Sequence, residues 1–86
     1  MNISVELTLT PLQDDFESPI IEFIKRLRSS GLKVLENPLS TQVYGEYDKV
    51  MSLFHTEIKS SFESTGNILL QMKIVKSDRS DYEPHF

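Results

Sequence analysis

The sequence predicts one α+β domain in which four antiparallel strands form a single sheet and two helices cover one face. Two observations predict this class. Segments with apolar residues at every second position are interspersed with segments whose apolar residues recur every three to four positions, and their order is strand, helix, strand, strand, helix, strand. That order is typical of the split βαβ, or ferredoxin-like, fold. A chain of 86 residues is too short for two cores, so we expect a single domain over residues 1–77 and a polar tail over residues 78–86.

The N-terminal segment predicts the first strand. From Ile3 to Leu9 apolar and polar residues alternate, which is typical of a strand with one buried face, and Pro11 ends the pattern. One set of alternate side chains should therefore contact the helices, and the other should lie on the face that the helices leave open. The first set contains Val5, Leu7 and Leu9, and the second contains Ser4, Glu6 and Thr8.

The first helix is predicted from Pro19 to Ser30. Ser18 is a typical N-cap residue, and proline is tolerated at the first helical position because its missing N–H has no helical partner there. Gly31 supplies the C-terminal stop. Short strands then follow at Leu32–Glu36 and Ser40–Glu46.

Asn37-Pro38 marks a break between these two strands, and Gly45 indicates a bulge or a close backbone approach. A second helix is predicted between an Asp48 cap and Gly66, with a buried stripe of Val50, Met51, Phe54, Ile58 and Phe62. The last strand, Asn67–Lys76, is apolar on both faces for part of its length, so we expect a central strand covered on two sides.

Composition excludes several classes of function. Cysteine is absent, which removes disulfides, thiolate metal sites and thiol nucleophiles. A net charge of −4 disfavours nucleic acid and anionic membranes as partners, and the N-terminus lacks the pattern of a signal peptide, so we expect a soluble cytoplasmic protein. The loop after the first strand is acidic, unlike a phosphate-binding loop, and the first and last strands carry none of the aromatic residues that an RNA-recognition module places on its central strands for base stacking.

Catalytic and metal-binding residues are also scarce. His55 is expected at a boundary or on the surface, and His85 in the tail, without a partner at catalytic spacing. The acidic loop (Asp14, Asp15 and Glu17) is expected to be solvated and not to bind calcium. We therefore expect no enzyme activity, no catalytic residues, no metal and no cofactor.

One group of polar residues is expected to converge at the sheet. Glu6 on the first strand, Asn37 after the second, and Ser40 and Thr41 at the start of the third would meet if these strands are neighbours. A carboxylate, an amide and hydroxyls beside apolar walls suit a small polar heterocycle, and Tyr44 could stack on its ring. The alternative is that Glu6 is only the polar face of a strand and Asn37-Pro38 only a turn.

Three segments resemble the thiamine-binding, YkoF-like small proteins of the DUF77 group. They are residues 5–12 (VELTLTPL), residues 30–33 (SGLK) and, most specifically, the run NPLST at 37–41 that leads to Gly45-Glu46. The resemblance implies a ferredoxin-like fold that assembles into a dimer or tetramer, with sheets of two chains joined and dimers stacked sheet against sheet. It also implies thiamine, or its hydroxymethylpyrimidine part, as a ligand that is bound without chemistry.

By this resemblance Glu6, Asn37, Ser40 and Thr41 lie near the ligand pocket, and Ser4 and Tyr44 are added by strand alternation. The protein would then be a carrier, buffer or sensor. By charge, an acidic site should disfavour the phosphorylated forms of the ligand. The competing hypothesis is a structural or regulatory homo-oligomer whose open sheet face contacts protein and binds no ligand, through exposed residues such as Leu35, Leu39 and Leu69.

Overall fold

The computed structural model describes residues 1–85 and confirms the predicted fold class. The elements follow the order β-α-β-β-α-β, and the four strands form one antiparallel sheet in the spatial order β2-β3-β1-β4. Their bounds are β1 Asn2–Pro11, α1 Glu17–Arg28, β2 Lys33–Glu36, β3 Thr41–Glu46, α2 Tyr47–Ser64 and β4 Ile68–Val75.

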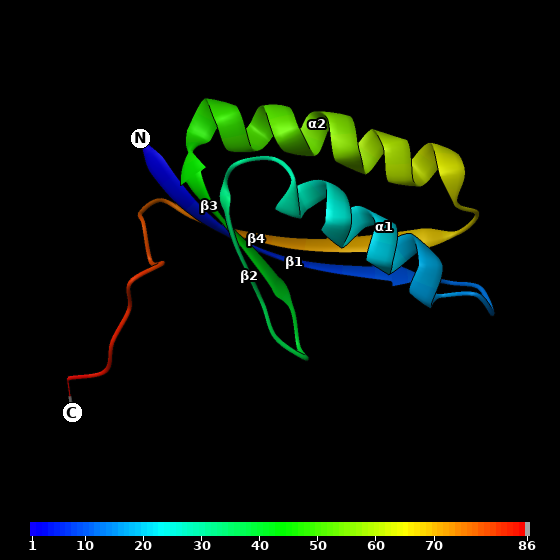
Figure 1. Cartoon of the computed structure of the whole chain (residues 1–86), viewed down its shortest axis with the longest axis horizontal. Helices are drawn as coiled ribbons and strands as arrows, with labels where there is room; N and C mark the ends of the chain where they lie inside the picture. Colours follow the sequence, from blue (N-terminus) through cyan, green and yellow to red (C-terminus); the bar gives the residue numbers. More distant parts are fainter. Residues whose placement is uncertain (86) are drawn as a thin grey trace.

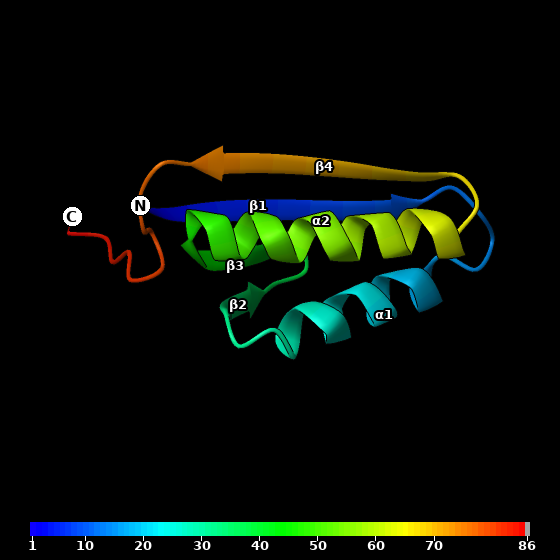
Figure 2. The same cartoon turned by 90° about the horizontal axis from the view of Figure 1, so that it is seen from above.

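The molecule has two layers. Both helices lie on the same side of the sheet, and the segment after β4 leaves on the opposite side (Figure 1). Seen from above, α2 runs over the middle of the sheet, whereas β4 lies outside the area that the helices cover (Figure 2). One face of the sheet is therefore open, and one edge strand lacks a helix above it.

The core lies between β1, β3 and the helices. The odd-numbered residues Ile3, Val5 and Leu7 of β1 are at most 2% exposed, as the alternation predicted. They pack with a set of buried side chains that comprises Phe23, Leu27, Val43, Val50 and Phe54. The polar side of the alternation, which includes Glu6, consequently faces away from the helices.

The helix starts differ from the prediction in their caps. α1 begins at Glu17, so Ser18 lies inside the helix, and the cap position is taken by Phe16 without a side-chain hydrogen bond. The carboxylate of Asp15 accepts from the Ser18 N–H instead, at 3.5 Å. In α2 the cap is Glu46, not Asp48, and its carboxylate accepts from the Lys49 N–H. A longer acidic side chain two residues earlier thus replaces the expected short one.

Gly31 and Gly45 have the roles that the sequence predicted for them. Gly31 adopts a φ of +84° just after α1, which is the left-handed conformation that favours glycine. At Gly45 a Cβ would lie 3.1 Å from Leu32 Cδ2 and 3.2 Å from Val50 Cγ2, so the backbone of Gly45 packs closely against these two side chains.

No helix among residues 1–85 is both long and apolar enough to cross a membrane.

Two predictions about apolar residues are wrong. Phe62, placed in the buried stripe of α2, is 47% exposed. The last strand, expected at the centre of the sheet, is an edge strand beside β1. Its residues Leu69, Met72 and Ile74 are 48%, 38% and 47% exposed, because β4 has no neighbouring strand on its outer side and lies outside the area that the helices cover.

Candidate functional site

Glu6 lies in the middle of the open face. Its neighbours across the sheet are Gln42 on β3 and Lys73 on β4, so all three side chains share the face opposite the helices. The Glu6 side chain keeps 47% of its surface exposed. A carboxylate is therefore held near the centre of the sheet and remains accessible from solution.

A chain of hydrogen bonds orients this carboxylate. The hydroxyl of Ser40 donates to Glu6 Oε2 at 3.0 Å, and the Gln42 side-chain amide donates to the same hydroxyl at 2.7 Å. From the other side, Lys73 Nζ lies 3.7 Å from Glu6 Oε1. That separation, with a Lys73 side chain that is 73% exposed, makes a loose ion pair that a ligand can displace.

The β2–β3 turn delivers Ser40 to this position. The side-chain oxygen of Asn37 accepts from the backbone N–H groups of Leu39 and Ser40, at 2.8 and 3.0 Å. The Asn37 N–H donates to the Ser40 carbonyl, which closes the turn. Asn37 thus acts here as a turn residue, the alternative considered from sequence, and it reaches Glu6 only through Ser40.

Thr41 does not join this cluster. It pairs with Leu7 in the register of β1 and β3, which places it on the helix side of the sheet. There it lines a hollow of about 220 Å³ with Asn37, Leu39 and residues of α1. The expectation that Thr41 would converge on Glu6 fails because successive residues of a strand point to opposite faces, so Ser40 and Thr41 cannot both face one ligand.

A second hollow, of about 170 Å³, lies on the open face beside Glu6. Tyr44 forms part of its wall, as predicted from strand alternation, and lies across from Ser4 in the β1–β3 register. The full lining is Ser4, Val5, Glu6, Gln42, Tyr44, Lys73, Val75 and Arg79. Ligand sites usually measure about 300–1,000 Å³, so one chain alone encloses only part of such a site.

Ser4 anchors the tail at this hollow. Its side chain is 6% exposed, and its hydroxyl donates to the Ser77 carbonyl at 2.7 Å and accepts from the Arg79 N–H at 2.8 Å. A further tail contact joins Lys33 Nζ to the Ser80 carbonyl at 3.4 Å. The hydroxyl that we expected to meet a ligand therefore holds chain segments together, and the tail supplies one wall.

The tail also has a local turn of its own. The carboxylate of Asp78 accepts from the Ser80 N–H at 2.8 Å, and hydrogen bonding by the Ser80 side chain, and next by this N–H, lowers the pKa of Asp78. Sequence reasoning missed Gln42, Lys73 and Arg79. Alternation with Tyr44 could have indicated Gln42, whereas Lys73 and Arg79 depend on the register of β4 and the path of the tail.

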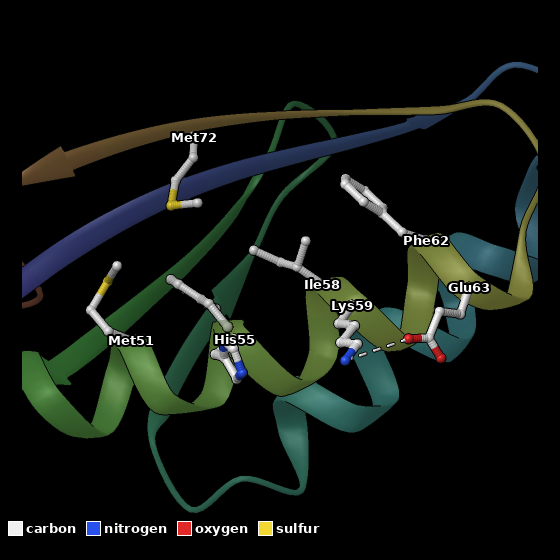
Figure 3. A pocket seen from close by; sticks show the side chains of 8 residues that line it. Met51, His55, Ile58, Lys59, Phe62, Glu63 and Met72 are labelled. Atoms are coloured by element: carbon white, nitrogen blue, oxygen red, sulfur yellow. Dashed lines mark ion pairs between the residues drawn. The ribbon is translucent and has the colours of Figure 1, made fainter.

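An apolar groove occupies the other side of the molecule, between α2 and β4. Met51, Ile58 and Phe62 project from α2 toward β4, where Met72 faces them (Figure 3). The groove measures about 690 Å³, and the exposed ion pair of Lys59 and Glu63 lies along its helix. His55 also lines the groove and is exposed, as expected of a surface histidine.

The fold and this cluster define a ferredoxin-like domain with a polar hollow on its open face, built around one carboxylate. A domain of this class can bind small molecules, although the fold by itself does not specify which ones. The family model described as thiamine-binding protein matches residues 5–86. The chain belongs to the thiamine-binding protein family, which confirms the resemblance inferred from its motifs.

Solved structures share the fold. A proposed thiamine biosynthesis/salvage protein from Thermotoga maritima aligns with a TM-score of 0.81 at 22% identity, over 90% of this chain and 85% of the other. A Streptococcus pneumoniae protein aligns with a TM-score of 0.83 at 22% identity, over 91% and 89%. A DUF77 domain from Bacillus cereus aligns with a TM-score of 0.74 at 14% identity, over 90% and 77%. No curated protein sequence matches this chain.

Proposed function

We propose that this protein binds thiamine, or its hydroxymethylpyrimidine part, on the open face of the sheet. It binds without chemistry and without a cofactor, as a cytoplasmic carrier, buffer or sensor. The observation that carries the proposal is the Glu6 carboxylate, which Ser40 and Gln42 orient and which stays half exposed beside Tyr44. Membership in the thiamine-binding protein family supports the identity of the ligand.

The chemistry of the hollow suits this ligand in two poses. Glu6 can accept from the amino group of the pyrimidine ring, in a charge-assisted hydrogen bond worth roughly 1.5–3 kcal/mol. Alternatively, Glu6 neutralises the thiazolium ring and Tyr44 adds a cation–π contact of about 0.5–2 kcal/mol. Both poses require Glu6 to be ionised and to exchange its loose contact with Lys73 for the ligand.

A second copy of the chain would complete the site. β4 is an edge strand of eight residues without proline, so its unpaired backbone groups can accept another strand. It also contributes Lys73 and Val75 to the hollow, so a joined copy would extend the hollow's wall. The exposed area of 5973 Å² exceeds the ~5,200 Å² typical of a monomer of this mass.

A thermal-shift experiment tests the ligand. Purified protein is heated with thiamine, hydroxymethylpyrimidine or no addition, and binding at a hundred times the dissociation constant should add ~2.7 kcal/mol to the free energy of unfolding. An unchanged melting temperature with both compounds would contradict the proposal. Native mass spectrometry of the same preparation counts the chains in the assembly and detects any small cation that purifies with it.

The alternative function is an oligomer that serves structure or regulation only. The apolar groove and the exposed residues Leu69, Met72 and Ile74 favour it, because they offer mainly apolar contact area. Leu35 and Leu39, 41% and 85% exposed, extend the apolar surface on other elements. A stable dimer that gives no thermal shift with either compound would support this alternative over the ligand.

A further inference from the structure

The hollow beside Glu6 carries more positive than negative charge. Its lining contains one carboxylate, from Glu6, and two cations, from Lys73 and Arg79. The chain as a whole has a net charge of −4, so two cations at one recess stand out against an acidic protein. A ligand with cationic character alone would leave both of these charges unmatched.

Arg79 is held at the hollow by the fold. Its backbone N–H donates to the buried hydroxyl of Ser4, and the same hydroxyl donates to the Ser77 carbonyl. Within the guanidinium, Nε donates to Ser77 Oγ at 2.9 Å, and the structure gives the terminal nitrogens no partner among residues 1–85. This leaves the end of the guanidinium available for a planar or tetrahedral anion.

Lys73 lies on the adjoining side of the hollow. Its ammonium has only the loose contact with Glu6, at 3.7 Å, and its side chain is 73% exposed. An ammonium group makes a strong point contact with phosphate oxygens. The nearby carboxylate of Asp78 is not part of the lining and is engaged by Ser80, so it does not compete for these two cations.

From these contacts we infer that the hollow takes a phosphate monoester joined to an amino-substituted or cationic ring, with the phosphate on Arg79 and Lys73 and the ring beside Glu6 and Tyr44. This inference rests on the proposed function, and it narrows the ligand to the phosphorylated class. The sequence predicted an acidic site that disfavours phosphorylated forms, with Glu6 as its charge. Lys73 on β4 and Arg79 in the tail add two positive charges, so the charge of the hollow favours a phosphate group.

Calorimetry with the full chain tests the inference, using thiamine, thiamine monophosphate and inorganic phosphate as probes. The wild-type protein should bind the monophosphate at least tenfold more tightly than thiamine. Arg79→Gln and Lys73→Gln should each reduce this preference to threefold or less. The matched control Lys25→Gln removes an exposed charge from α1, where Lys25 has only a 4.0 Å contact with Glu22, and should leave the preference unchanged.

The outcomes separate the two proposals. Equal affinity for thiamine and its monophosphate, or a preference that survives both substitutions, would overturn the phosphate inference and leave thiamine binding intact. Inorganic phosphate binding as tightly as the monophosphate would also overturn it, since the ring would then contribute nothing. Failure of all three probes to bind would contradict the proposed function itself. Because Arg79 and Lys73 are exposed, circular dichroism of the variants should match the wild type.

Discussion

Ser40 donates a hydrogen bond of 3.0 Å to the carboxylate of Glu6, across 34 positions of sequence. The contact exists because Asn37 folds the β2–β3 turn so that Ser40 enters the sheet on its open face. The most specific sequence motif of this chain, residues 37–41, therefore acts on Glu6 through the turn that it builds.

Glu6→Gln should weaken thiamine binding more than tenfold and leave the melting temperature of the free protein nearly unchanged. The substitution removes the negative charge that either pose uses, while the half-exposed ion pair with Lys73 contributes little to folding. Titration calorimetry measures the affinity. Glu22→Gln is the control, because Glu22 is also an exposed partner of a lysine but lies on α1. Equal affinity of Glu6→Gln and wild type would remove Glu6 from the site.

Ser40→Ala should weaken thiamine binding several-fold, whereas Thr41→Val should have little effect. Ser40, just before β3, orients the carboxylate on the open face, whereas Thr41 points to the helix side of the sheet. Calorimetry of thiamine binding to both variants shows which face of the sheet holds the ligand. If Thr41→Val lost more affinity than Ser40→Ala, the ligand would belong in the hollow on the helix side, which Thr41 lines.

The sequence carried enough local information for the fold but only part of the site. Alternation in β1 predicted which face Glu6 occupies, and the glycine and Asn-Pro signals predicted two chain reversals. The order of the strands could not be predicted in this way, because it depends on contacts between segments that are distant in the sequence. The apolar run of β4 indicated burial, yet the strand lies at an edge.

The remaining site residues depend on register. Lys73 faces Glu6 only because β4 pairs with β1 in that alignment, and a shift by one residue would turn Lys73 to the other face. Arg79 reaches the hollow because the Ser4 hydroxyl binds the tail. Neither relation is visible in composition or periodicity, and both became apparent only in three dimensions.

Gly45→Ala should destabilise the protein by about 1–3 kcal/mol, the usual cost of overpacking a core. A Cβ would meet Leu32 at 3.1 Å and Val50 at 3.2 Å, and Val50 is fully buried. Chemical denaturation measures the loss. At Gly66 the nearest atom to a new Cβ is 3.7 Å away, an ordinary contact, so Gly66→Ala should cost much less. Equal losses at the two glycines would contradict close packing at Gly45.

The ion pair between Arg28 and Glu36 should contribute a pH-dependent term to stability. The hydrogen bonds that the guanidinium donates, at 2.6 Å, hold the pKa of Glu36 below its ordinary value. Since the folded-state pKa is lowered, the contribution is present above the unfolded-state pKa and disappears as the pH falls through the folded-state value, in the acid range below about 4.3.

An NMR titration of the Glu36 side-chain carboxyl tests this pair. Its midpoint should rise in Arg28→Met, because the variant removes the hydrogen bonds that favour the ionised form. The acid limb of the stability curve should also flatten in the variant. A midpoint that is the same in both proteins would mean that the contact does not persist in solution.

Ile74→Lys should prevent self-association without unfolding the monomer. Ile74 is 47% exposed on the edge strand β4 and pairs with the buried Val5, so its side chain points to the helix side of the sheet. A lysine there loses little packing within one chain, but it would place a charge on the helix side of the seam where a second copy of β4 joins. Light scattering should report a dimer or larger assembly for wild type and a monomer for the variant. Leu35→Lys is the matched control, since Leu35 is 41% exposed on β2, the opposite edge.

If the Ile74→Lys variant still assembles and the Leu35→Lys variant does not, the interface lies at the β2 edge. If Ile74→Lys also weakens ligand binding while Leu35→Lys does not, the second copy contributes to the hollow beside Glu6.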